Sequence, residues 1–140
     1  MTEKEGTKSA SGDPLSPEEL TRIQPGMARL MVEYSQRFWT LYYAGKAENW
    51  DLAHYMLREM RKLGEIIVLT RPKYAEAMRE FQGGPLTVLE EAIRAKDWGK
   101  LEAAYRATME SSDSYHEKFG KPFIRFQLPD HPPEWLKMEP

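Results

Sequence analysis

The chain has 140 residues, enough for one domain with its own core, and its formal net charge of −2 gives no electrostatic reason to expect a nucleic-acid or anionic-membrane partner. No run of about 18 apolar residues occurs, so we expect no membrane span. The chain has no cysteine, which excludes disulfides, thiolate nucleophiles and thiolate metal ligands.

Residues 1–16 are polar and rich in Lys, Glu, Ser, Thr and Gly, which predicts a disordered N-terminal tail. They lack the apolar stretch of a signal peptide. We therefore expect a cytoplasmic protein, with a periplasmic location as the alternative if a signal peptide has been removed.

The first helix is predicted to begin at Ser16–Glu19, where a capping Ser precedes Pro and two carboxylates. Pro25-Gly26 should kink this helix or separate a short leading turn from its main body, and Gly45 is a plausible stop. Apolar residues follow a helical stripe along it, namely Leu20, Ile23, Met27, Leu30, Tyr34, Phe38 and Leu41.

Three further helical segments are predicted, from near Asn49 to just before Thr70, from Pro72 with an interruption at Gly83–Pro85, and from Asp97 to Gly120. Residues 17–120 are thus expected to form an all-α, antiparallel up-down-up-down four-helix bundle. Residues 121–140 contain five prolines and should lie extended over the bundle or be mobile. We expect six residues to be largely buried: Trp50, Leu57, Met60, Leu89, Leu101 and Tyr105.

The segment 47–50 (Ala-Glu-Asn-Trp) resembles 95–98 (Ala-Lys-Asp-Trp), 48 residues further on. Each places a capping Asn or Asp before a Trp at a predicted helix junction. Two helical hairpins in tandem would produce this echo, and so would one turn solution that arose twice. The sequence leaves both explanations open.

Neither nucleic-acid binding nor catalysis is indicated. The aromatic residues between Tyr34 and Tyr43 have no basic patch beside them, so we interpret them as core with two interfacial tyrosines. No Ser–His–Asp arrangement or phosphate-binding loop is present, and Glu90-Glu91 is interpreted as a solvated helix face. We therefore expect a protein that is not an enzyme.

Asp51-x-x-His54 and Asp113-x-x-His116 each place a carboxylate and an imidazole on one helix face. In the expected bundle the two helices run parallel, and the histidines lie at different depths along them. A rise of about 1.5 Å per residue then separates the pairs by roughly 20 Å, too far to share one metal. We expect no metal site.

Ser112–His116 has the five-residue frame of a c-type haem attachment site, but Ser112 and Tyr115 stand where the two thiols should be. A hydroxyl and a phenol do not form thioether links to haem. Only His116, at the position of the iron ligand, is retained.

From about Gln24 onward the chain resembles bacterial four-helix proteins related to cytochrome c′. The likeness is carried by Leu41–Ala53, which is similar to the first hairpin of that family, and by the Ser112–His116 frame with Gly120, Phe123-Ile124 and Pro132-Pro133 after it. The resemblance implies a cytochrome c′-like four-helix bundle. It also implies, by analogy with the family, a homodimer formed through bundle helices.

The leading hypothesis is a non-enzymatic, haem-free bundle that binds a small ligand or an unidentified partner, with Tyr115 filling part of the vacated cleft. The alternative is noncovalent haem binding or electron transfer with His116 as axial ligand and Ser112 and Tyr115 beside it. A third interpretation is an enzyme that uses Asp113 and His116 as an acid–base pair, which predicts a perturbed His116 pKa in an open cleft.

Overall fold

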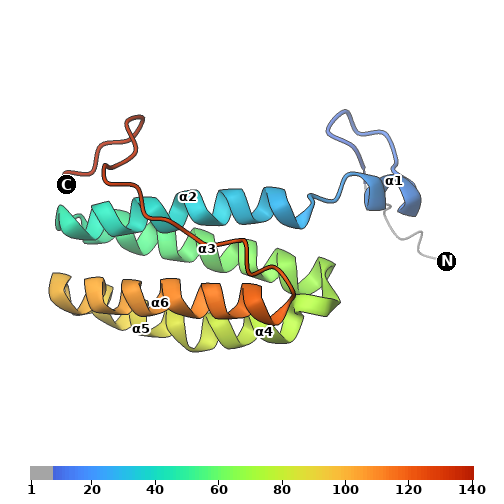
Figure 1. Cartoon of the computed structure of the whole chain (residues 1–140). Helices are drawn as coiled ribbons and strands as arrows, with labels where there is room; N and C mark the ends of the chain where they lie inside the picture. Colours follow the sequence, from blue (N-terminus) through green and yellow to red (C-terminus); the bar gives the residue numbers. More distant parts are fainter. Residues whose placement is uncertain (1–7) are drawn as a thin grey trace.

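The computed structural model describes residues 8–140, and every regular element in them is an α-helix (Figure 1). The predicted all-α class is confirmed. The helices are α1 (Pro17–Arg22), α2 (Met27–Lys46), α3 (Trp50–Thr70), α4 (Pro72–Gly83), α5 (Pro85–Arg94) and α6 (Trp98–Lys118). None of the helices in residues 8–140 is long and apolar enough to cross a membrane.

Helices α2 to α6 lie side by side along a common long axis (Figure 1). Helix α2 packs along α3, α5 packs along α6, and α2 also contacts α6. Helices α4 and α5 lie end to end and are separated at Gly84, as expected from the Gly83–Pro85 interruption. Both α4 and α5 pack on α3, so the five helices enclose one core.

Helix α1 stands apart from this core (Figure 1). Ser16 caps it as expected, because its hydroxyl accepts from the Glu19 backbone N–H at 3.1 Å. No residue of α1 is buried, and Ile23 is 65% exposed. The expectation that Leu20 and Ile23 continue the core stripe is therefore wrong, because the break before Gly26 turns α1 away. Of the predicted disordered tail, residues 1–7 lie outside the described residues.

The turns between α2 and α3 and between α5 and α6 have the same geometry. Glu48 and Lys96 both have positive φ, at 59° and 51°. In each turn the next backbone N–H bonds back to a helix carbonyl, from Asn49 to Ala44 at 2.8 Å and from Asp97 to Ala92 at 3.2 Å. The echo between residues 47–50 and 95–98 thus corresponds to one repeated turn.

The core prediction is confirmed at five of its six positions, since Leu57, Met60, Leu89, Leu101 and Tyr105 are at most 1% exposed. Trp50 is only half-buried. It is the first residue of α3, at the end of the helical body, where one side of the indole faces solvent.

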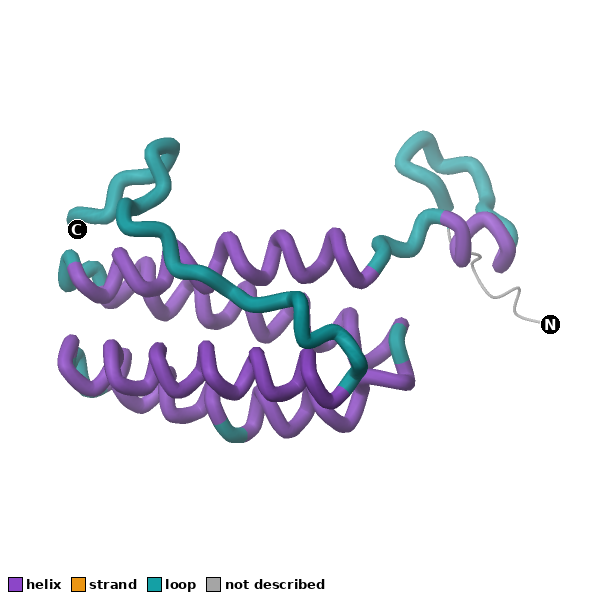
Figure 2. Tube along the Cα trace, viewed as in Figure 1, coloured by secondary structure: helices purple, strands orange, loops and turns teal. Residues whose placement is uncertain are grey.

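Residues 121–140 run back as an extended strap along the helices (Figure 2). Two aromatic residues of α2 hold the strap by hydrogen bonds: Trp39 Nε1 donates to the carbonyl of His131 at 2.8 Å, and Tyr43 Oη donates to that of Pro129 at 2.6 Å. Phe126 packs against Phe38, with ring centroids 5.1 Å apart. The extended position, one of the two expected alternatives, is the one observed.

Candidate functional site

A cavity of about 530 Å³ lies between the beginning of α2, helix α4, the end of α6 and the first part of the strap. This volume falls within the usual range for small-molecule sites, roughly 300–1,000 Å³. Most of its wall is apolar and is built from methionine and aromatic side chains, including Met27, Met31, Met78, Phe81 and Phe119. The cavity can therefore accommodate a small molecule with a substantial apolar part.

The three site residues predicted from the sequence, Ser112, Tyr115 and His116, all line this cavity. The helical spacing explains why: positions 112, 115 and 116 are three and four residues apart and so share one face of α6. Asp113 lies on the next position around the helix and is not part of the wall.

Tyr115 forms one side of the cavity and does not fill it. Its hydroxyl donates a hydrogen bond to Glu80 on α4 at 3.0 Å, and its ring lies edge-on to Phe81 with centroids 6.1 Å apart. Burial and the hydrogen bond to Glu80 raise the pKa of this phenol. Tyr115 thus links α6 to α4 through this hydrogen bond.

Burial lowers the pKa of His116, although the Asp113 carboxylate and the Ile124 backbone act in the opposite direction. The imidazole is therefore neutral near pH 7. Its Nδ1 is buried and has no hydrogen-bond partner within residues 8–140. A neutral imidazole is the form that can accept a hydrogen bond or ligate a metal.

No hydrogen bond or ion pair joins Asp113 to His116 in the described part of the chain. The Asp113 carboxylate is instead 3.8 Å from Arg125 Nε, and its other oxygen is buried without a partner there. The third interpretation predicts a perturbed His116 pKa, and the pKa is lowered, but the cause is burial in the cavity wall, whereas the Asp113 carboxylate acts to raise it.

Two parts of the site were not anticipated from the sequence. Tyr34 lines the cavity and is 7% exposed, and its buried hydroxyl has no partner in residues 8–140. The strap contributes Lys121 and residues 124–127. A usable signal was the apolar residues Ile124 and Phe126 among polar strap residues, which indicate a segment that packs on the helices; Phe123, apolar as well, is 79% exposed.

His54, of the other Asp/His pair, lies in a separate cluster of charges, whereas Asp51 is exposed. His54 Nε2 is 4.0 Å from Glu90, whose carboxylate also pairs with Arg61 at 3.0 Å and Arg94 at 2.8 Å. Glu90 is thus a half-buried link between α3 and α5, and its interpretation as part of a solvated face is wrong. Within residues 8–140 no group of three or more metal-ligating side chains occurs.

Comparison of the chain with protein-family models, with curated proteins and with solved structures gave no match. The resemblance to cytochrome c′ proteins stays an expectation from the sequence.

Proposed function

We propose that this protein is a non-enzymatic, haem-free four-helix bundle of the cytochrome c′ type, with antiparallel up-down-up-down helices, and that it binds a small apolar molecule. The observation that carries the proposal is a roughly 530 Å³ apolar cavity on the α6 face where the damaged haem-attachment frame lies. A concave, mostly apolar cavity of this size is the usual form of a small-molecule site, which supports the proposal.

Covalent haem does not fit these residues. Ser112 and Tyr115 have no thiol, and the Tyr115 hydroxyl is already bonded to Glu80. The cavity nevertheless remains open between α2, α4 and α6. These two facts together favour a ligand held by burial and hydrogen bonds alone.

A second candidate is noncovalent haem binding or electron transfer through His116. The observation in its favour is the neutral imidazole in the cavity wall, whose Nδ1 lacks a hydrogen-bond partner within residues 8–140. Haem bound there would supply a redox-active iron. His116 would be its protein ligand, and the apolar wall would exclude water.

Two titrations of the full-length protein separate these candidates. In the first, haem is added and the Soret band is followed in the wild type and in His116→Ala. A tight Soret complex that is lost in His116→Ala supports the haem-binding candidate, and no measurable haem affinity removes it.

In the second titration, an uncharged apolar fluorescent dye, Nile red, is added to the native protein. We expect saturable binding that Ala28→Trp abolishes, since Ala28 lines the cavity and its position on α2 is exposed. Gln36→Trp is the matched control, because Gln36 is exposed on the same helix and lies outside the wall. Equal dye binding by all three proteins would contradict the proposed site.

By the same likeness we propose a homodimer that pairs through α2, on which Val32 is 59% exposed. Sedimentation equilibrium of the wild type and of Val32→Glu tests this. A monomeric wild type at concentrations of about 100 μM would remove the proposal, since a specific pairing is expected to hold there.

A further inference from the structure

We propose that the ligand of this cavity is an amphipathic monocarboxylate, with its hydrocarbon part among the methionine and aromatic side chains and its carboxylate at Lys121, beside Arg125. The proposal deepens the proposed function and rests on it. The ligand is thus an anion, and its charge is bound at Lys121.

The charged residues in the cavity wall all have the same sign. Of the 18 residues that line the cavity, Lys121 and Arg125 are the two that carry a full charge at neutral pH, and none is Asp or Glu. The chain as a whole has 22 acidic and 20 basic residues, so this excess of positive charge is local. A mostly apolar cavity whose charged wall residues are both cations is complementary to an anion with an apolar body.

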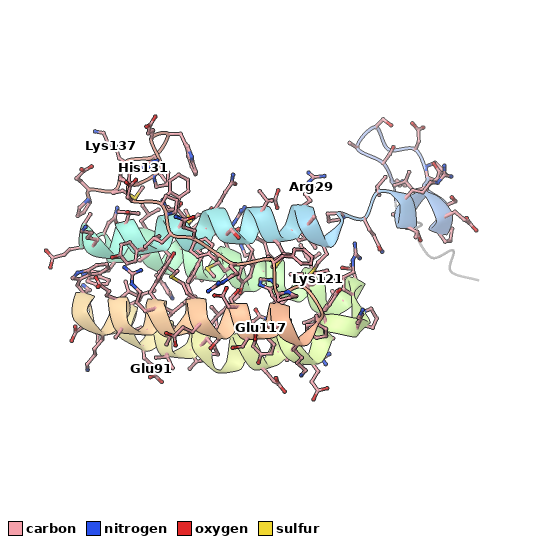
Figure 3. All side chains as sticks on the ribbon, in the orientation of Figure 1. Arg29, Glu91, Glu117, Lys121, His131 and Lys137 are labelled. Carbon is pink, nitrogen blue, oxygen red and sulfur yellow. The ribbon has the colours of Figure 1, made fainter. Side chains whose placement is uncertain are left out.

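The turn after α6 places Lys121 at the cavity. Gly120 has φ of +74°, and the Lys121 backbone N–H bonds back to the His116 carbonyl at 2.8 Å. Figure 3 shows Lys121 where the chain leaves α6, between that helix and the start of α2. The position of Lys121 relative to the wall is therefore fixed by a hydrogen-bonded turn.

Lys121 is half-buried without an opposite charge. Its Nζ donates to the Tyr74 hydroxyl at 3.3 Å and lies 5.7 Å from the centre of that ring. No carboxylate lies within ion-pair distance of this nitrogen in residues 8–140. Two of its three N–H donors remain for a ligand, and a charge-assisted bond to a carboxylate is the interaction that stabilises such a cation best.

Arg125 is a second donor, carried on the exposed strap. It is paired loosely with Asp113 through Nε, at 3.8 Å, and its side chain is 76% exposed. The remaining guanidinium N–H groups are available to an anion at the cavity mouth. Its contribution should be smaller than that of Lys121 because solvent screens exposed charges.

The apolar wall indicates a flexible hydrocarbon body. Met27, Met31 and Met78 are unbranched and adapt to irregular shapes, in contrast to a wall of β-branched residues. Phe81 and Phe119 complete the surface. This combination suits a medium-length alkyl chain.

The test compares three ligands with the same ten-carbon chain, decanoate, decanol and decyltrimethylammonium, by calorimetry on the full-length protein. The two ions are used below their micellar concentrations and decanol below its solubility limit. We expect decanoate to bind about tenfold or more tightly than decanol, as a charge-assisted hydrogen bond implies, and the cation to bind most weakly. Lys121→Met should remove the advantage of decanoate, and Lys121→Arg should restore most of it. Lys118→Met, an exposed position outside the wall, is the matched control.

Equal affinities of decanol and decanoate, or an unchanged decanoate affinity in Lys121→Met, would overturn this inference and leave the proposed apolar site standing. If none of the three ligands binds, both this inference and the proposed apolar site are wrong. Decanoate binding that survives Ala28→Trp would place the anion elsewhere and also overturn the inference. If Lys121→Met does not fold, the salt dependence in the wild type decides, since only decanoate affinity should fall with added salt.

Discussion

The ring of Tyr105 on α6 lies flat against the ring of Phe38 on α2, with centroids 3.9 Å apart and planes within 8° of each other. The Tyr105 hydroxyl also donates to the backbone carbonyl of Phe38 at 2.9 Å and is fully buried. One side chain thus joins α6 to α2 by stacking and by a hydrogen bond. Because Phe38 also packs on Phe126, this contact connects the helical core to the strap.

Removing the two parts of this contact should have separable effects. Tyr105→Phe deletes the hydrogen bond but keeps the ring, and should lower the free energy of unfolding by about 1 kcal/mol. Tyr105→Ala also deletes the ring and should lower it by about 3–5 kcal/mol. Urea unfolding followed by circular dichroism measures both. Equal losses for the two variants would show that the stacked ring contributes nothing.

A second prediction concerns the crossing of α2 and α6 at Gly45. A Cβ at this position would collide with Leu101, which is fully buried and has no room to move. Gly45→Ala should therefore lower the free energy of unfolding by about 1–3 kcal/mol, in spite of the higher helix propensity of alanine.

Gly64→Ala is the control for this crossing. Its Cβ would meet the end of the Gln82 side chain, 2.6 Å away, and a half-buried amide can rotate aside. We expect a change below about 1 kcal/mol, measured by the same urea titration. A larger loss at Gly64 than at Gly45 would contradict the assignment of the tight contact to α2 and α6.

For the repeated turn we expect substitutions that raise the free energy of unfolding. Glu48 and Lys96 have the left-handed backbone conformation that glycine usually supplies after a helix end. Glu48→Gly and Lys96→Gly should each raise the free energy of unfolding, by up to about 1 kcal/mol, because the strain of a Cβ at positive φ is removed. Glu65→Gly, at an exposed position within α3, should lower it by about 1 kcal/mol. Thermal unfolding of the three variants shows whether each substitution raises or lowers the free energy of unfolding.

The starts of these helices can be predicted from the sequence where the residue type itself favours one backbone conformation. Asn49 and Asp97 each accept a hydrogen bond from the backbone three residues ahead, at 3.2 and 3.0 Å, as their capping role predicts. Pro72 and Pro85 begin helices, as proline at the first position favours. At these positions the residue type itself limits the backbone.

The remaining features depend on tertiary contacts that no local pattern encodes. Gly45 was expected to end a helix, and α2 does end one residue later, at Lys46, but the close approach of Leu101 to Gly45 follows from packing alone. Glu90 was expected to be solvated, yet Arg61 from α3 partly covers it. The frame at Ser112–His116 located one wall of the cavity, but the opposite wall comes from α2, α4 and the strap, whose meeting point follows from packing alone.

His116 should make the protein's stability depend on pH. Burial holds the pKa of its folded form below the ordinary value of 6.5, so the unfolded chain binds the proton first as the pH falls. Above about pH 7.5 the imidazole is neutral in the folded and in the unfolded state, so it does not make the free energy of unfolding depend on pH. Below 6.5 the unfolded state gains the proton, and the free energy of unfolding decreases until the folded form is protonated as well.

His116→Gln removes this proton and keeps a polar side chain of similar reach. We expect the wild type to lose more stability than this variant between about pH 7.5 and pH 5, with the two curves running in parallel above that range. Urea unfolding at several pH values gives both curves, and the measurements near pH 8 provide the internal reference. Parallel curves over the whole range, or a steeper acid loss in His116→Gln, would show that His116 is not held neutral by burial in the cavity wall.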